Sequence, residues 1–445
     1  MNALGPEFVA ILMLGGVLVA VLTGFPLAIG IGGVGFLVGV MLFGPSITLD
    51  MFYDRTFNML MNYILLAVPL FVFMGTMMER SGVAEGMYGA LYLWFGGLRG
   101  GLAITTVVIG AIVAACVGII GASVTMLALM ALPAMINRGY DKSLAVGAVC
   151  GGGTLGILIP PSIMLVIYGP MAAISVGKLF FGAFIPGFTL AALYCVYIAV
   201  YCLFRRHAGP PMPVEDRKVP LARKVSMLAV SLVPPVVIIL AVLGTIFLGV
   251  ASPTEAAGVG SVATTILAVA YRRFSFAVLK DVALATVRIA SMILLIGALS
   301  FAFVGIFMRA GCDKAVVNLL LSIPGGRWGV FAFVMFIFFI LGFFIDWIGI
   351  LYILVPIVTP IGDALGFDAL WFAMMICVNL QMSFMTPPFA YALFYVRGAA
   401  DPALGITTAT IIRGMIPYVF LIMVGLLLCI AFPQIILWLP GKMLH

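Results

Sequence analysis

The chain has 445 residues, of which 65% are hydrophobic and only 8% are charged, and its formal net charge is +7. Soluble domains carry about 25% charged residues, so this composition excludes an ordinary soluble enzyme and places the chain in a membrane. Its apolar runs reach the ~20 residues that a helix needs to cross a bilayer. Strand periodicity is absent, so the spanning elements are expected to be helices.

The hydropathy pattern predicts ten membrane crossings. The first segment carries no basic residue before Glu7, so we expect it to be retained and not cleaved as a signal peptide. The expected crossings are residues 7–24, 26–44, 62–80, 142–170, 174–205, 225–248, 253–271, 287–309, 368–396 and 405–438. Segments 48–58 and 274–285 mix apolar and charged residues and are expected to lie at the membrane surface, as hinged arms or as plain connectors.

A basic, proline-rich segment at 206–224 divides the chain into a first half, 1–205, and a second half, 225–445. If this connector is cytoplasmic, most of the 22 Lys and Arg side chains fall on the cytoplasmic side. That distribution satisfies the positive-inside rule and places both termini outside. The net positive charge therefore follows from membrane topology and does not indicate nucleic-acid binding.

The two halves repeat each other at a constant offset in residue number. The recurring pairs are Pro26 and Pro253, Gly33 and Gly260, Pro133 and Pro360, Asp141 and Asp368, and Pro160-Pro161 and Pro387-Pro388. Five crossings per half is an odd number, so the second half is expected to be inverted relative to the first. Internal symmetry with Gly- and Pro-interrupted membrane segments is typical of secondary transporters.

Two long apolar stretches, 101–137 and 328–362, hold polar residues at their middle. In the expected topology each stretch begins and ends on the same side of the membrane, which predicts a re-entrant hairpin. The expected tips are residues 118–125 and 343–349. Irregular backbone survives at mid-membrane depth only where it faces protein, ions or water.

Each hairpin is followed by a helix that the sequence interrupts. Glycines in 149–156 and the prolines at 160–161 weaken the first helix, and residues 379–388 repeat this pattern in the second half. Free carbonyls at such breaks can bind a cation, and the positive ends of half-helices can face an anionic substrate. The oxygen atoms nearby suit a hard cation such as sodium, and they belong to Ser123, Thr125, Thr154, Asp346 and Thr386.

The residues around these breaks resemble the signature of the large membrane subunit of TRAP transporters. The similar segments are 138–142, 148–162, 166–169, 379–381 and 386–388, and the resemblance covers essentially the whole chain. It implies an all-α elevator-type carrier with scaffold and transport domains in the bacterial inner membrane, driven by a sodium gradient. It also implies a small four-helix membrane subunit and a soluble periplasmic binding protein that delivers an organic acid.

The resemblance assigns residues to two sodium sites and one substrate site. The first sodium site comprises Gly118, Ser123, Thr125, Gly151, Gly153 and Thr154, and the second comprises Asp346, Gly349, Met382 and Thr386. The substrate carboxylate is expected between the two breaks, near Ser123, Thr154, Pro160, Asn379, Ser383 and Pro387. Many relatives carry two adjacent hydroxyl residues where this chain has Ala122-Ser123, so Ser123 serves alone or a backbone carbonyl replaces the missing oxygen.

Several alternatives stay open at the level of sequence. Asp346 is the only carboxylate deep within a long apolar run, which favours an ion-coupling role over a structural one, with a proton as the alternative to sodium. Ser123 and Thr125 could instead simply pack helices. The rival functions are an ion channel and the membrane subunit of an ATP-driven importer. No residue distinguishes a dicarboxylate from a keto acid or a sugar acid, and no G-x-x-x-x-G-K-[ST] motif or enzyme cofactor site is expected.

Overall fold

The structure is a computed structural model that describes residues 5–213, 215, 218–387 and 390–443, and at positions 114, 116 and 117 it describes the backbone only. These residues form α-helices and short 3₁₀ segments, and the described part of the chain contains no strand. An all-α architecture follows, as the composition predicts.

The described residues of the first half form ten α-helices. They are α1 (Pro6–Leu22), α2 (Leu27–Phe43), α3 (Pro45–Leu60), α4 (Ala67–Arg80), α5 (Val83–Phe95), α6 (Gly101–Val117), α7 (Ile120–Ile136), α8 (Lys142–Thr154), α9 (Ile163–Ala172) and α10 (Val176–Phe204). Short 3₁₀ segments, Tyr63–Leu66 and Leu155–Ile157, precede α4 and follow α8.

The second half follows the same order. Its helices are α11 (Leu221–Phe247), α12 (Pro253–Ala270), α13 (Phe276–Arg309), α14 (Cys312–Leu321), α15 (Gly326–Leu341), α16 (Trp347–Ala364), α17 (Ala369–Ser383), α18 (Tyr391–Ala399), α19 (Thr408–Ala431) and α20 (Gln434–Leu437). Pro402–Leu404 and Pro440–Lys442 are 3₁₀ segments. Helices α16 and α17 begin at Trp347 and Ala369, and they correspond to α7 and α8 of the first half. The starts of these paired helices differ by the same number of residues as the repeated prolines do.

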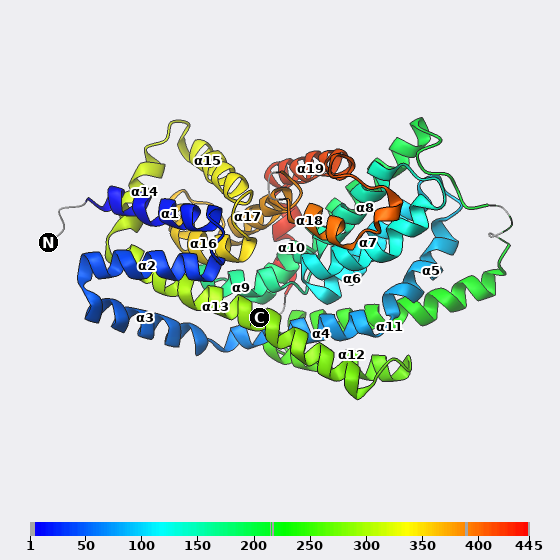
Figure 1. The fold of residues 1–445 in the computed structure, drawn as a ribbon, viewed down its shortest axis with the longest axis horizontal. Helices are drawn as coiled ribbons and strands as arrows, with labels where there is room; N and C mark the ends of the chain where they lie inside the picture. Colours follow the sequence, from blue (N-terminus) through cyan, green and yellow to red (C-terminus); the bar gives the residue numbers. More distant parts are fainter. Residues whose placement is uncertain (1–4, 214, 216–217, 388–389, 444–445) are drawn as a thin grey trace.

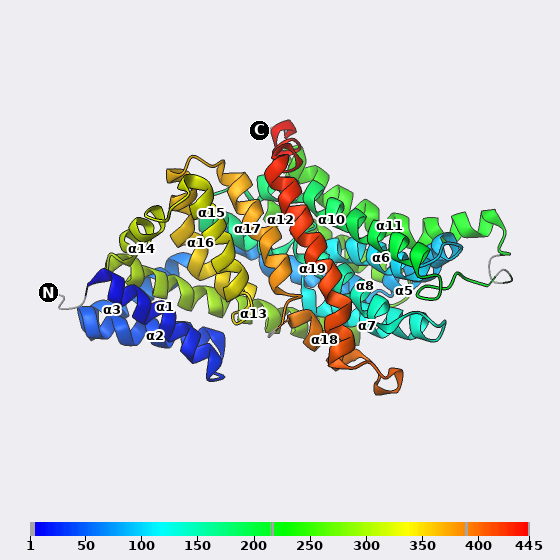
Figure 2. The ribbon, with the colours of Figure 1, turned by 90° about the horizontal axis from the view of Figure 1, so that it is seen from above.

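The two halves interlock along the long axis of the molecule. Helices α1, α2 and α3 lie at the same end as α14, α15 and α16, whereas α5 to α8 lie with α11 at the other end (Figure 1). Helix α2 packs on α13, and α4 packs on α12, so each half supplies neighbours to the other. The interrupted helices α8–α9 and α17–α18 approach one another in the middle, where α19 crosses at a steep angle (Figure 2).

Six helices within the described ranges are long and apolar enough to cross a membrane, namely 63–80, 176–204, 221–247, 276–309, 347–364 and 408–431. Together with the apolar composition they make the chain a multi-pass membrane protein. Five of the six coincide with expected crossings. The sixth, α16, falls within the expected second hairpin, and α1 and α2 have 17 residues each.

The segment at 274–285, expected at the membrane surface, is continuous with the crossing that follows it. Residues 276–309 form one continuous helix, α13, whose first turn is capped by the hydroxyl of Ser275. The corresponding region of the first half is divided into α3 and α4, because the backbone becomes extended at Asn62, whose side chain accepts a hydrogen bond from the Ile64 amide. No proline occurs between Phe276 and Arg309, so nothing interrupts the helix there.

Two short helices were not expected from the sequence. Helix α5 has 13 residues and α14 has 10, and each begins directly after a glycine in the left-handed region, Gly82 and Gly311. Both occupy equivalent places, just before the helix pairs α6–α7 and α15–α16. Helix α11 begins at Leu221, so the connector between the halves ends slightly earlier than expected.

Candidate functional site

The first apolar stretch, 101–137, is interrupted at Gly118-Ile119, between α6 and α7. Gly118 has φ of +63°, a left-handed conformation that glycine adopts without strain. A Cβ atom at this position would lie 3.4 Å from the Ile163 side chain and 3.6 Å from the Pro161 carbonyl oxygen. The first interruption therefore sits directly against the break between α8 and α9.

Ser123 and Thr125 lie on α7, past the interruption rather than within irregular backbone. Ser123 is 1% exposed, and its hydroxyl oxygen has no hydrogen-bond partner in the described part of the chain. Thr125 is half-buried. Burying a hydroxyl without a partner costs about 1–3 kcal/mol, so the Ser123 oxygen is suited to receive a ligand.

The glycines of the first broken helix allow close helix packing. Helix α8 continues through them to Thr154, and the chain becomes irregular at 158–162. A Cβ atom on Gly153 would lie 2.5 Å from a Val124 methyl group, and one on Gly151 would lie 2.4 Å from the Tyr418 ring. Gly153 thus holds α8 against α7 next to Ser123.

Polar groups near the first break bond mostly to nearby backbone. The Thr154 hydroxyl donates to the Gly151 carbonyl at 3.1 Å, and the Ser162 hydroxyl donates to the Ile157 carbonyl. Pro160 is buried between them. Thr154 is 0% exposed, so its oxygen faces the protein interior and not lipid.

The second apolar stretch, 328–362, is interrupted at 342–346, and Asp346 directly precedes α16. Asp346 is half-buried, and its carboxylate is close enough to Tyr391 and Tyr395 of α18 to interact electrostatically with both. Gly349 lies in the first turn of α16, where a Cβ atom would lie 2.7 Å from Leu27 of α2. The Cα atom of Gly349 is therefore packed closely against α2.

In the second broken helix, α17 ends at Ser383 and α18 begins at Tyr391. The Thr386 hydroxyl donates to the Met382 carbonyl at 2.7 Å, so these two predicted ligands contact each other. Pro387 is exposed, and its neighbour Pro388 lies outside the described residues.

Asn379 and Ser383 connect this helix to the second hairpin. The Asn379 amide donates to the Met335 carbonyl at 2.7 Å, and the Ser383 hydroxyl donates to the Phe339 carbonyl at 3.4 Å. A Cβ atom at Gly342 would lie 2.2 Å from the Ser383 side chain. Both predicted substrate residues therefore fix α15 against α17.

Contacts across the halves bring the four interruptions together. The Thr154 hydroxyl lies 3.6 Å from the Met385 sulfur, which joins the first helix break to the second. A Cβ atom at Gly121 would lie 2.9 Å from the ring of Tyr395, the same residue that interacts with Asp346. Tyr395 thus links the two hairpin interruptions, and the predicted site residues gather around one region, apart from Gly349 and Pro387.

Gln381 is a polar residue in this region that the sequence reading did not assign to the site. It is 1% exposed, and neither its amide nitrogen nor its amide oxygen has a hydrogen-bond partner among the described residues. The repeat could have found it, because Gln381 occupies the place in the second half that Thr154 occupies in the first. A buried amide with two unpaired atoms offers both a donor and an acceptor to a ligand.

No group of three or more His, Cys, Asp or Glu residues that could hold a metal ion occurs in the part of the chain that the structure describes. The oxygen atoms here come from hydroxyl groups, carbonyl groups and one carboxylate. Such a weakly charged set of oxygen donors does not match a transition-metal site and is chemically compatible with a hard cation.

The comparison with protein families decides what kind of protein this is. Residues 14–435 match the family described as "Tripartite ATP-independent periplasmic transporter, DctM component". The chain belongs to the DctM family. The resemblance to TRAP large membrane subunits, drawn from residues 138–169 and 379–388, is thereby confirmed. Members of the family are named as transporter permeases, which agrees with the expectation that the chain is not an enzyme.

Individual relatives match over nearly the full chain. The C4-dicarboxylate TRAP transporter large permease protein DctM of Pseudomonas aeruginosa is 30% identical, over 90% of this chain and 92% of its own length. The isethionate TRAP transporter permease protein DctMQ of Oleidesulfovibrio alaskensis is 27% identical over 94% of this chain and 64% of its own length. Among solved structures, the YdaH transporter of Alcanivorax borkumensis shares the fold, with a TM-score of 0.61 at 14% identity, covering 88% of this chain and 90% of that one.

Proposed function

We propose that this DctM-family chain carries out sodium-coupled secondary active uptake of an organic acid across the bacterial inner membrane. The observation that supports this most strongly is the meeting of two hairpin interruptions with two broken helices around buried oxygen atoms. The Ser123 hydroxyl has no partner within the described residues, and Thr154 contacts the second break through Met385. Oxygen atoms left unpaired in an apolar protein are costly unless a ligand pairs with them.

The first sodium site lies between α7 and the first broken helix. Ser123 supplies a hydroxyl oxygen, and the neighbouring backbone at Gly118 and Gly153 supplies carbonyl oxygens, which replace the adjacent hydroxyl that many relatives carry. The close approach of Gly153 to Val124 supports this arrangement, because it leaves no room for a side chain between α8 and α7. Sodium, a hard cation, accepts such a shell of neutral oxygens.

The second sodium site includes Asp346, with Thr386 and the Met382 carbonyl. A carboxylate held inside the membrane needs a compensating charge, and a bound cation supplies it. Tyr391 and Tyr395 of α18 are near enough to Asp346 to interact with it electrostatically. Gly349 faces α2, so its part in this proposal is to allow that helix to approach.

The substrate carboxylate lies between the two breaks, near Thr154, Gln381 and the first residues of α9 and α18. The amino-terminal ends of these half-helices carry partial positive charge, which favours an anionic group. Asn379 and Ser383 support the site by fixing α15 to α17. Named relatives carry C4-dicarboxylates or isethionate, both of which are organic anions, so an organic acid is the class of substrate that fits.

Transport proceeds by an elevator movement of one part of the molecule against the rest. The mobile part comprises α6 to α9 and α15 to α18, which hold the ions and the substrate. Helices α1 to α5 and α11 to α14 form the scaffold, and the two halves form inverted repeats. The recurrence of helix starts at a constant offset and the packing of α2 on α13 and α4 on α12 support this division.

The chain acts as the large subunit of a tripartite system. A small membrane subunit and a soluble periplasmic binding protein are the partners proposed. The name of one relative, DctMQ, joins two components, and this chain covers only 64% of its length, which supports a second membrane component of that kind.

Uptake by proteoliposomes tests this function. The complete system, reconstituted with its binding protein, is expected to accumulate an organic acid only when an inward sodium gradient is imposed. Conductance without a gradient would identify a channel, and dependence on ATP would identify an ATP-driven importer. Uptake driven equally well by a proton gradient in sodium-free buffer would show that protons replace sodium.

A further inference from the structure

An apolar cavity lies beside the proposed second sodium site, between α1, α14, α15 and α16. Its volume is about 440 Å³, and its wall is almost wholly apolar. The residues that define it include Leu14, Gly15, Leu319, Ile345 and Gly349, and the carboxylate-bearing Glu7 is the one charged residue among those that line it. Neither sodium nor an organic acid would bind such a wall.

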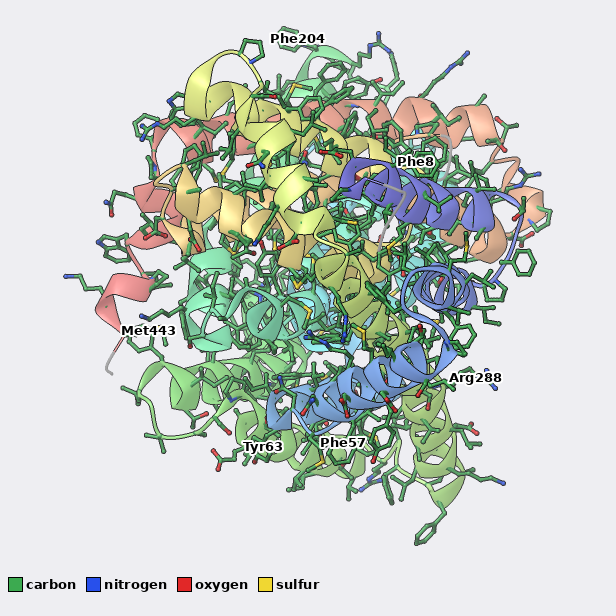
Figure 3. The ribbon with its side chains drawn as sticks, turned by 90° about the vertical axis from the view of Figure 1, so that its left-hand side faces the viewer. Phe8, Phe57, Tyr63, Phe204, Arg288 and Met443 are labelled. Atoms are coloured by element: carbon green, nitrogen blue, oxygen red, sulfur yellow. The ribbon has the colours of Figure 1, made fainter. Side chains whose placement is uncertain are left out.

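The cavity opens among exposed apolar side chains. Three of its lining residues are large, apolar and exposed, namely Ile11 at 71%, Leu319 at 67% and Phe333 at 42%. Phe8, one turn from Ile11 on α1, is 53% exposed and marks this end of the molecule in Figure 3. Because the chain is a membrane protein, the surrounding medium at this apolar rim is the acyl chains of lipids.

The volume of the cavity, about 440 Å³, lies within the range of about 300–1,000 Å³ that is typical for small-molecule sites. Its almost wholly apolar wall opens among exposed apolar side chains, which suits an acyl chain, the apolar ligand that a bilayer supplies.

Two carboxylates, those of Glu7 and Asp313, lie in the first turns of α1 and α14. Pro6 lies close to Gly311, which brings the starts of these two helices together, and both Glu7 and Asp313 are close enough to Cys312 to act on it electrostatically. One Asp313 carboxylate oxygen is buried without a hydrogen-bond partner, and neither acid forms an ion pair with a cation of the described residues. Glu7 lines the cavity and Asp313 lies beside it at the start of α14, so this end of the cavity is complementary to a positively charged group.

We propose that this cavity binds one acyl chain of a membrane phospholipid whose amino head group, as in phosphatidylethanolamine, pairs with Glu7 and Asp313. The apolar wall receives the chain, and the two carboxylates receive the ammonium group. The chain reaches Ile345 and Gly349, on either side of Asp346, and supports the backbone of the second interruption from the lipid side. The importance of that support for transport rests on the proposed function, whereas binding of the lipid does not.

Photolabelling of the full chain in nanodiscs tests the binding. The probe is phosphatidylethanolamine with a diazirine near the end of one acyl chain, and labelled peptides are located by mass spectrometry. Gly15→Phe fills the cavity, because a Cβ atom at Gly15 meets nothing within 4 Å. Gly258→Phe in α12 is the matched control, since Gly258 is equally open and lies away from the cavity.

We expect labelling of the α14 and α16 peptides in the parent chain and in the Gly258→Phe variant, with a several-fold loss in Gly15→Phe. Labelling spread evenly over all lipid-facing helices, or unchanged by Gly15→Phe, would overturn the proposal. The measurement needs no sodium and no uptake. A variant that loses labelling but still transports would show that the lipid site is not needed for transport. A variant that keeps labelling but does not transport would leave the lipid site intact while the proposed function fails.

Thermal unfolding provides a second readout. Ligands that bind only the folded state stabilise it, so adding phosphatidylethanolamine to delipidated protein in detergent should raise the unfolding temperature. The rise should be present in Gly258→Phe and absent in Gly15→Phe. A Glu7→Gln, Asp313→Asn double variant should respond equally to phosphatidylethanolamine and phosphatidylglycerol. A parent chain that already shows no preference between these lipids would refute the head-group assignment.

Discussion

The hydroxyl oxygen of Thr154 lies 3.6 Å from the sulfur of Met385, although the two residues are 231 positions apart in the chain. Thr154 ends α8, and Met385 follows α17, so this contact joins the two broken helices directly. Both side chains are buried. The two breaks are therefore packed against each other, and we expect the proposed ion sites to respond together when one of them is altered.

Ser123→Ala tests the first sodium site. The Ser123 hydroxyl is buried and has no partner in the described residues, so its removal costs the folded protein little. If it binds sodium, the half-saturating sodium concentration for uptake should rise about tenfold, equivalent to a loss of about 1.4 kcal/mol of binding free energy. Uptake by proteoliposomes across a sodium titration gives this value.

Ser261→Ala is the control for that experiment. Ser261 is also buried, but its hydroxyl donates to carbonyls of Leu70 and Ala257 in and beside α12. Its removal should lower thermal stability slightly and leave the sodium dependence unchanged. An unaltered sodium dependence in Ser123→Ala would show that Ser123 only packs helices.

Asp346→Asn tests the second site. The substitution keeps the size of the side chain and removes the charge that a bound cation would balance. Uptake should be lost while the protein is still inserted and folded, as judged by size-exclusion chromatography in detergent. Asp363→Asn, an exposed position in the last turn of α16, should transport normally. Near-normal uptake by Asp346→Asn would argue against an ion at this place.

The breaks could be predicted from the sequence because they depend on local chemistry. Glycine at 118 takes a left-handed conformation, and prolines at 160–161 end the helical pattern. The internal repeat then placed the second pair of breaks. A glycine or a proline constrains the backbone at its own position, so these residues were sufficient to predict where the helices are interrupted.

Two features were harder to predict: a helix that continues because no residue ends it, and a contact between distant parts of the chain. Charged residues Lys280 and Asp281 suggested a surface segment, yet α13 runs through them because no proline or capping residue ends it. The role of Gly349 also required three dimensions. Its contact with Leu27 joins residues from opposite halves of the chain, and no local pattern encodes such a pairing.

Gln381→Leu tests the residue that the sequence reading omitted. Both amide atoms of Gln381 are buried without partners in the described part, so an apolar side chain of similar size should leave thermal stability unchanged or raise it. If the amide binds substrate, uptake should fall by at least tenfold, with the larger effect on the apparent affinity for substrate. Stability and uptake are measured on the same preparation.

Asn379→Leu serves as the contrasting variant for Gln381→Leu. The Asn379 amide donates to the Met335 carbonyl at 2.7 Å, so its loss removes a buried hydrogen bond and should cost about 0.5–1.5 kcal/mol of stability. A lower unfolding temperature is therefore expected for Asn379→Leu and not for Gln381→Leu. If Gln381→Leu were stable and transported normally, Gln381 would have no part in substrate binding.

Gly153→Ala tests the close contact between α8 and α7. The added methyl group would lie 2.5 Å from a Val124 methyl carbon and 2.9 Å from the Val124 Cα atom, closer than real Cβ contacts allow. Helix α7 must therefore shift, and Ser123, the residue before Val124, shifts with it. Gly33→Ala in α2 adds the same group where nothing lies within 4 Å and should be neutral or stabilising by about 0.5–1 kcal/mol. We expect Gly153→Ala to raise the half-saturating sodium concentration for uptake, as Ser123→Ala does. An unchanged half-saturating concentration would show that the first ion does not bind between these helices.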